Sequence, residues 1–172
     1  MDPETELARR AAGGDAAAFT RLVRRHAAPV RRFLRRLLPQ DGADDVAQEV
    51  FVKAWRMRAA WREDGPYGAW LMRIAWTSFV SFYRANRRHG GGDAPAADEP
   101  SGYRDADAAL DMARAMAGLE PRERAAAQLC FAEGYSHGEA AHILQLPLGT
   151  LKNVVARARS QLAAALETNH DA

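Results

Sequence analysis

The chain has 172 residues, of which 48% are hydrophobic and 27% are charged. This length suffices for one medium-sized domain or two small ones, and it excludes a large multidomain enzyme. The single cysteine, Cys130, excludes an internal disulfide framework and a cysteine-rich zinc site, and we expect no metal or other cofactor. Because we find no apolar run that resembles a signal peptide or a membrane span, we expect a cytoplasmic protein without direct membrane insertion.

The net charge of +2 hides an uneven distribution. Residues 1–88 carry a net charge of +7, residues 89–110 carry −4 and residues 111–172 carry −1. Residues 89–104 combine glycine, proline and acidic residues with few apolar side chains, a composition typical of a flexible linker. We therefore predict two small domains, residues 1–88 and 105–172, joined by an acidic linker at residues 89–104.

Every strongly patterned segment predicts a helix, so the expected fold class is all-α. Asp15 is expected to cap a first helix that starts at Ala16 and that Pro29 should kink or divide. The further helices are expected at residues 43–60, 68–88, 105–117, 121–132, 136–145 and 148–167.

The helix expected at residues 43–60 has a polar face opposite its apolar face. At 100° per residue, the core face consists of Val46, Ala47, Val50, Phe51, Ala54 and Met57. The opposite face consists of Asp44, Asp45, Gln48, Glu49 and Arg56, with Val52 and Trp55 among them. An apolar pair within a polar face is typical of a protein-binding surface, although Trp55 at its edge could also fold into the core.

Nine of the 14 aromatic residues, including all four tryptophans, lie between residues 51 and 83. The core face of the helix at residues 68–88 is expected to contain Leu71, Ile74, Ala75, Ser78, Phe82 and Ala85. The opposite face gathers Trp70, Arg73, Thr77, Val80, Ser81, Arg84, Arg87 and Arg88, with Trp76 and Tyr83 at its boundary and Trp61 and Tyr67 in the preceding loop. Arginines can bind phosphates and aromatic rings can stack on bases, which favours nucleic-acid binding. The alternative is a solvated basic face with the rings turned into the core.

Residues 134–150 are typical of a helix-turn-helix, with a short helix, a tight turn at Pro147–Gly149 and a longer helix after it. The buried stripe of the longer helix is expected to contain Leu151, Val154, Val155, Ala158, Leu162 and Leu166. The outer face carries Lys152, Asn153, Ala156, Arg157 and Ser160, with Thr150 and Arg159 at its margins. Such donors suit base edges and phosphates, although an ordinary helical hairpin is the alternative.

On these residues, the chain resembles the group IV, or extracytoplasmic-function (ECF), sigma factors of bacterial RNA polymerase. Residues 41–55, Asp41-Gly-Ala-Asp-Asp-Val-Ala-Gln-Glu-Val-Phe-Val-Lys-Ala-Trp55, are similar to the region 2 motif of that family. Residues 70–75 resemble the start of its helix that reads the promoter −10 element. Residues 119–124 and 134–159 resemble region 4. The resemblance implies a sigma-2-like helical bundle and a sigma-4-like helix-turn-helix domain.

The resemblance also implies a function: a non-enzymatic protein that binds core RNA polymerase and directs promoter-specific transcription initiation by reading −10 and −35 elements. The residues implied in binding the polymerase β′ clamp are Asp44, Asp45, Gln48, Glu49, Val52 and Trp55. Those implied at the −10 element are Trp61, Tyr67, Arg73, Trp76, Thr77, Val80, Ser81, Arg84 and Arg87. Those implied at the −35 element are Thr150, Lys152, Asn153, Ala156, Arg157 and Arg159. The implied partners are core polymerase (including the β flap), promoter DNA and an anti-sigma factor, with no small-molecule substrate.

The residues leave two other classes of protein as alternatives. A stand-alone helix-turn-helix regulator with a sensing or dimerising N-terminal domain would bind duplex DNA tightly without polymerase, which the −1 charge of residues 111–172 does not favour. A helical metalloenzyme could use Asp44, Asp45 and Glu49, but these residues lack a companion Glu-x-x-His motif.

Overall fold

The computed structural model describes residues 3–88 and 106–170, and the predicted linker at residues 89–104 lies outside them. The described residues form helices and connecting turns, without a strand among them, which confirms the all-α prediction. The chain divides into two compact units. The first unit contains Met1–Leu34 and Asp41–Gly92, and the second contains Arg35–Gln40 and Asp93–Ala172.

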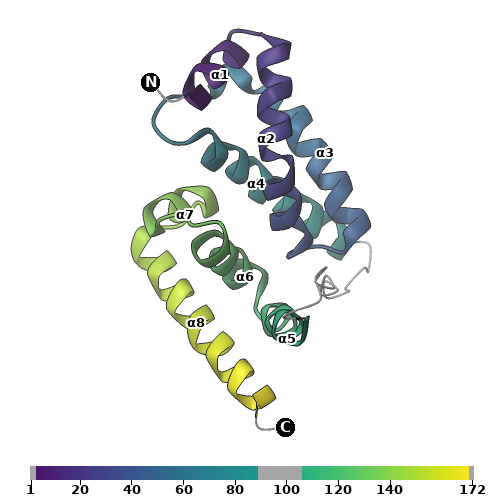
Figure 1. Ribbon diagram of the computed structural model, residues 1–172, viewed down its shortest axis with the longest axis vertical. Helices are drawn as coiled ribbons and strands as arrows, with labels where there is room; N and C mark the ends of the chain where they lie inside the picture. Colours follow the sequence, from purple (N-terminus) through teal and green to yellow (C-terminus); the bar gives the residue numbers. More distant parts are fainter. Residues whose placement is uncertain (1–2, 89–105, 171–172) are drawn as a thin grey trace. The chain divides into compact units, whose positions relative to one another are not determined.

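Figure 1 labels the α-helices in chain order. The first unit holds α1 (Pro3–Ala12), α2 (Ala16–Arg35) except its last residue, α3 (Gln40–Arg56) except its first residue, the short 3₁₀ helix η1 (Arg58–Ala60) and α4 (Tyr67–Arg88). The second unit holds α5 (Ala106–Ala117), α6 (Pro121–Ala127), the π-helical turn η2 (Gln128–Ala132), α7 (His137–Leu144) and α8 (Leu148–His170).

The core of the first unit is built from large side chains of α2, α3 and α4. The largest fully buried ones are Phe33, Phe79, Leu22, Leu34, Leu71, Val30, Val46 and Val50. Helices α3 and α4 approach closely at Gly42, where an added Cβ atom would lie 3.2 Å from Cζ of Phe82. Lys53 of α3 also donates a hydrogen bond of 3.1 Å to the buried Ser78 hydroxyl of α4. Glycine therefore lets the two helices pack over an aromatic ring.

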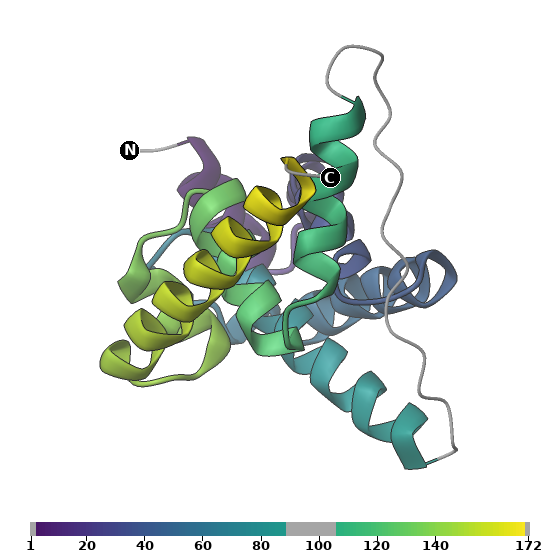
Figure 2. The same cartoon turned by 90° about the horizontal axis from the view of Figure 1, so that it is seen from below.

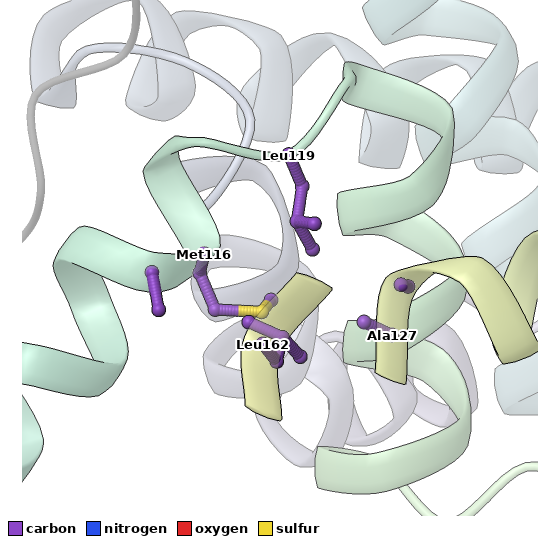
Figure 3. Packing of buried hydrophobic residues seen from close by; sticks show 6 residues of the cluster. Met116, Leu119, Ala127 and Leu162 are labelled. Atoms are coloured by element: carbon purple, nitrogen blue, oxygen red, sulfur yellow. The ribbon is translucent and has the colours of Figure 1, made fainter. Parts of the chain in front are cut away.

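The second unit packs α5, α6 and α7 against α8. Figure 2 shows α8 alongside α5 and α6. Figure 3 shows the cluster at their junction, in which Met116 and Leu119 meet Leu162 near Ala127. The buried face of α6 includes Ala125, Ala126 and Ala127, and these small side chains allow α8 to approach closely.

Arg124 is a buried charge in this second core, only 3% exposed. Its guanidinium donates hydrogen bonds to the carbonyl oxygens of Met116 (2.8 Å), Ala117 (2.7 Å) and Leu119 (2.8 Å). These carbonyls lie at or just beyond the C-terminal end of α5, where a helix leaves backbone acceptors unsatisfied and where positive charge is favoured. Arg124 therefore caps α5, a role that sequence analysis did not identify.

The helix boundaries confirm most of the predicted elements. The carboxylate of Asp15 accepts a hydrogen bond of 3.0 Å from the backbone N–H of Ala18, which confirms the predicted cap of α2. Pro29 does not divide α2, which continues to Arg35 with Leu22 and Val30 buried on either side of the proline. A kink at Pro29, the other predicted effect, stays a prediction. Helix α1 was not predicted.

The predicted turn before α8 and three predicted core residues need correction. The turn before α8 lies at residues 145–147 and not at Pro147–Gly149, because Gln145 adopts a left-handed conformation (φ 55°) that ends α7, and Gly149 lies inside α8. Met57, predicted in the core, is 48% exposed, because α3 ends at Arg56 and the helical phase no longer applies. Ala85 is also exposed and Phe82 is half-buried, since both lie in the last turns of α4.

Candidate functional site

The outer face of α3 combines acidic residues with an exposed aliphatic side chain. Asp45, Gln48 and Glu49 are exposed, Asp44 is half-buried, and Val52 is 49% exposed. Glu49 forms an ion pair of 2.6 Å with Lys53 one turn later. Helical spacing thus displays the predicted polymerase-binding residues on one side of α3.

Trp55 lies at the edge of this face and is half-buried. Its ring packs against Phe19 of α2, with ring centroids 5.0 Å apart. The guanidinium of Arg58 lies 4.3 Å from the ring centroid, a cation–π geometry. Both alternatives for Trp55 therefore hold in part: the ring contacts α2 and also contributes an edge to the surface of α3.

Three aromatic residues predicted at the −10 element lie in the core of the first unit. Trp61 is 8% exposed, Tyr67 is 4% exposed and Trp76 is 6% exposed. The rings of Trp61 and Tyr67 meet edge to face, with centroids 5.8 Å apart. Burial raises the pKa of the Tyr67 phenol well above its ordinary value, and the nearby Glu4 carboxylate raises it further. In this structure the three rings therefore belong to the core that supports the exposed face of α4, and they are not part of that face.

The exposed face of α4 carries the remaining −10 candidates. Thr77, Ser81, Arg84 and Arg87 are exposed, and Arg73 and Val80 are half-buried. The hydroxyl of Thr77 donates to the carbonyl of Ile74 (3.0 Å), and that of Ser81 donates to the carbonyl of Thr77 (3.0 Å). Because each hydroxyl proton is used within the helix, the oxygens that remain available act as hydrogen-bond acceptors. The face therefore offers cationic donors and hydroxyl acceptors.

The loop before α4 is tied to α1. Arg9 of α1 donates two hydrogen bonds to the Glu63 carboxylate, Nε to Oε1 at 2.8 Å and Nη2 to Oε2 at 2.9 Å. These hydrogen bonds lower the pKa of Glu63. Glu4 anchors α1 on α2 through an ion pair of 2.8 Å with Arg25. Arg9 and Glu63 were not predicted as site residues, because α1 was not predicted and the two residues are far apart in the sequence.

The helix-turn-helix of the second unit consists of α7, the turn at residues 145–147 and α8. Ser136 caps α7 by accepting a hydrogen bond from the N–H of Glu139 at 3.2 Å, and the Glu139 carboxylate accepts one from the N–H of Ser136 at 2.8 Å. All six residues predicted at the −35 element are exposed on α8: Thr150, Lys152, Asn153, Ala156, Arg157 and Arg159.

Two of these arginines contact residues outside α8. Arg157 forms an ion pair of 3.4 Å with the nearly buried Glu123 of α6. The guanidinium of Arg159 lies 5.3 Å from the ring centroid of Phe131, which is 45% exposed. Neither partner was singled out from the sequence as part of this face.

The described residues do not favour a metal site, a reactive cysteine or a membrane-spanning helix. Among the described residues, no group of three or more His, Cys, Asp or Glu side chains could hold a metal ion. Cys130 is half-buried, and burial raises the pKa of its thiol, which disfavours the reactive thiolate. Within residues 3–88 and 106–170, every helix lacks the long apolar stretch that a membrane-spanning helix requires.

Comparison with known proteins matches both units. Sigma-70 region 2 matches residues 22–89, and Sigma-70, region 4 matches residues 109–162. The RNA polymerase sigma factor CnrH of Cupriavidus metallidurans is 32% identical over 99% of this chain and 100% of its own length. The ECF RNA polymerase sigma factor SigM of Mycobacterium tuberculosis is 33% identical over 93% of this chain and 83% of its own length. Among solved structures, the sigma factor RpoE of Bartonella quintana, in complex with the anti-sigma factor NepR, matches with a TM-score of 0.78 and 27% identity, covering 87% of this chain and 96% of that one.

Proposed function

Because the chain belongs to the extracytoplasmic-function group of sigma-70 RNA polymerase sigma factors, which direct promoter-specific transcription initiation and are not enzymes, we propose that its two units bind different promoter elements while α3 holds core polymerase. The observation that carries this proposal is the exposure of all six −35 candidates on one side of α8, directly after the helix-turn-helix turn. A stand-alone regulator is not favoured, since the sigma matches cover both regions of the chain.

In this proposal, α3 docks on the β′ clamp of core polymerase. Asp45, Gln48 and Glu49 supply a polar, acidic surface, and Val52 supplies an apolar contact that is solvent-exposed in the free protein. The edge of Trp55 extends that apolar contact. An apolar centre with a charged rim is the usual composition of a protein interface.

Helix α4 and the loop before it bind the −10 element. Arg84 and Arg87 bind phosphates, and the hydroxyl oxygens of Thr77 and Ser81 accept hydrogen bonds from base edges. Promoter melting then proceeds without nucleotide hydrolysis, because capture of an unstacked base offsets an unpairing cost of about a few kcal/mol. The buried rings of Trp61, Tyr67 and Trp76 act mainly by holding this surface, and a captured base would reach them only after local opening.

Helix α8 enters the major groove of the −35 element. Arg157 and Lys152 donate to base acceptors or phosphates, and Asn153 can bind an adenine edge. Residues 111–172 carry a net charge of −1, so this unit is expected to bind DNA weakly by itself. Attachment to core polymerase, including the β flap, raises the effective concentration of α8 at the −35 element.

Two further parts of the proposal concern regulation and place. An anti-sigma factor would hold the protein inactive, as the complex of the similar RpoE with NepR suggests. The protein would act in the cytoplasm, where promoter DNA and polymerase lie.

Run-off transcription with purified core polymerase tests the proposed promoter recognition. Templates are fragments whose transcript starts have been mapped in cells after overexpression. We expect transcripts from fragments with intact −10 and −35 elements and loss of transcripts when either element is scrambled. Tight binding of the isolated protein to the same fragments, without any transcript on adding core polymerase, would instead support a stand-alone regulator.

Charge reversal on α3 tests the docking surface. The variant Asp45→Arg/Glu49→Arg should weaken binding to core polymerase about tenfold or more, because the reversed charges oppose a complementary surface on the polymerase. Fluorescence-detected titration with core polymerase measures this affinity. The matched control is Glu167→Arg in α8, which alters an exposed carboxylate in the second unit and should leave the affinity unchanged. Equal affinities for the double variant and the control would remove α3 from the interface.

A further inference from the structure

Glu123 lies beneath the outer face of α8 and is in contact with it. The residue is 5% exposed and belongs to the first turn of α6. Its Oε1 atom lies 3.4 Å from Nη1 of Arg157 and 3.4 Å from Nε2 of Gln161, both on α8. Its Oε2 atom accepts a hydrogen bond of 3.2 Å from the backbone N–H of Glu120. One carboxylate therefore joins the start of α6 to two residues of the proposed recognition helix.

A carboxylate this deeply buried needs compensating positive charge. Part of it comes from the N-terminal end of α6, where the helix dipole favours an anion. The other part comes from Arg157, whose side chain remains 67% exposed. A guanidinium has five N–H donors, so one contact with Glu123 leaves several donors free for DNA. The Arg157 guanidinium thus contacts Glu123 on one side and is exposed to solvent on the other.

We propose that Glu123 is a positioning residue for −35 recognition. It restricts the Arg157 guanidinium to one place on α8, so that the free donors are preorganised toward a base edge. Its negative charge also reduces the attraction of Arg157 for phosphates at any sequence, which lowers non-specific binding. The inference rests on the proposed contact between Arg157 and the −35 element.

The variant Glu123→Gln tests this role with little change in shape. Glutamine can replace glutamate at the third position of a helix-capping motif, so α6 keeps its start. Holoenzyme binding is measured on one mapped promoter with an intact −10 element and either its own or a scrambled −35 element. We expect the ratio of the affinity for the intact −35 element to that for the scrambled one to fall about three- to tenfold. The reason is that Glu123 no longer holds the Arg157 guanidinium in place for its base contact. Binding to the scrambled element should rise about twofold as one negative charge is lost.

Opposite changes in the two affinities separate positioning from damage to the fold, because an unfolded α8 would bind both elements more weakly. The matched control is Glu139→Gln, which removes one charge from the equivalent capping position of α7. Glu139 has its capping contacts with Ser136. The control should leave the affinity ratio unchanged.

Two more variants keep the inference falsifiable if Glu123→Gln folds poorly. Glu123→Asp retains the charge but withdraws the carboxylate by one methylene, so the ratio should fall while binding to the scrambled element stays constant. Glu123→Gln in an Arg157→Gln background should produce no further change in the ratio, because the residue through which Glu123 acts is already gone. Far-UV circular dichroism checks that each variant is helical.

The outcomes distinguish this inference from the proposed function. Wild-type holoenzyme that binds both −35 sequences equally would contradict the −35 role of α8 itself. Wild-type discrimination that persists unchanged in Glu123→Gln would overturn the positioning role alone. An equal fall in the ratio with and without Arg157 would also overturn it, since Glu123 would then act through the fold.

Discussion

The two units differ in what they bury beneath the surfaces assigned to DNA. The first unit buries four rings: Trp61 precedes the basic helix α4, and Tyr67, Trp76 and Phe79 lie on the buried side of α4 itself. The second unit leaves its two described aromatic residues, Phe131 and Tyr135, at least partly exposed, and it builds its core from alanine and aliphatic side chains. Aromatic residues among arginines therefore pack in the first unit, whereas small residues in the second let one long helix lie on its neighbours and expose its polar side.

The replacement Trp76→Ala should cause the largest change, a loss of stability in the first unit. The Trp76 ring is 6% exposed and lies 5.3 Å from the Phe79 ring between centroids. Its loss should lower the free energy of unfolding of the first unit by about 3–5 kcal/mol, through lost burial and a residual cavity. Urea unfolding followed by tryptophan fluorescence reports on this unit, because all four tryptophans lie in it.

The neighbouring replacement Thr77→Ala is the control, since Thr77 is exposed on the same helix. It should change the free energy of unfolding by less than about 0.5 kcal/mol while reducing transcription from promoters with an intact −10 element. If Trp76→Ala instead kept full stability and abolished transcription, the ring would act on DNA directly and the contrast between the two units would fail.

The second unit shows where sequence patterns suffice. Helix α8 packs on α5, α6 and α7 along one side, so a single phase at 100° per residue separates its buried Leu151 and Val155 from its exposed Lys152 and Arg157. The six −35 candidates could all be placed on the exposed side from the sequence. The exact turn could not, because it depends on the left-handed backbone of Gln145, a residue with no marked preference for that conformation.

In the first unit, the same pattern placed α2, α3 and α4 but not α1, and it placed only part of the site. Trp76 lay at a phase boundary, and its burial depends on neighbours in three dimensions that periodicity does not contain. Arg9 and Glu63 are 54 residues apart, so their ion pair leaves no local signal. Met57 followed the phase of α3 but lies beyond the end of that helix.

The replacement Arg157→Ala tests the contact that the second unit makes with the −35 element. The variant should weaken holoenzyme binding to its own −35 element by about 1–3 kcal/mol if Arg157 makes a bidentate base contact. Electrophoretic mobility shift on fragments with native and scrambled −35 elements measures the difference. Glu167→Gln, an exposed change near the C-terminal end of the same helix, is the control and should have little effect. A loss of the same size on both fragments would indicate a phosphate contact instead.

The connections before the proposed DNA helices also differ between the units. The loop before α4 is held by the exposed Arg9–Glu63 ion pair, whereas the turn before α8 is held by backbone hydrogen bonds such as that from the N–H of Leu146 to the carbonyl of Ala141 at 2.9 Å. Salt weakens the Arg9–Glu63 ion pair by screening its charges, whereas it does not screen the backbone hydrogen bonds of the turn before α8.

Arg9→Ala should therefore reduce open-complex formation about two- to fivefold at low salt and less at high salt. The reversed pair Arg9→Glu/Glu63→Arg should restore most of it in permanganate footprinting, and a variant without effect at low salt would show that the loop needs no tie to α1.

The helix caps of the two units also differ, since α2 begins with a carboxylate and α7 with a hydroxyl. The hydrogen bond from the N–H of Ala18 and the contact with Arg10 lower the pKa of Asp15 below its ordinary value. A lowered folded-state pKa contributes stability that is fully present above the ordinary pKa and is lost as pH falls through the folded value.

Asp15→Asn keeps a good capping residue but cannot ionise, so the stability difference from wild type in urea unfolding should be largest near pH 7 and shrink toward pH 3. Ser136→Ala, which removes a cap that does not titrate, should cost about 1 kcal/mol in the second unit with little dependence on pH. A pH-independent difference for Asp15→Asn would mean that Asp15 stabilises α2 only as a neutral hydrogen-bond acceptor, and the electrostatic contrast between the two caps would disappear.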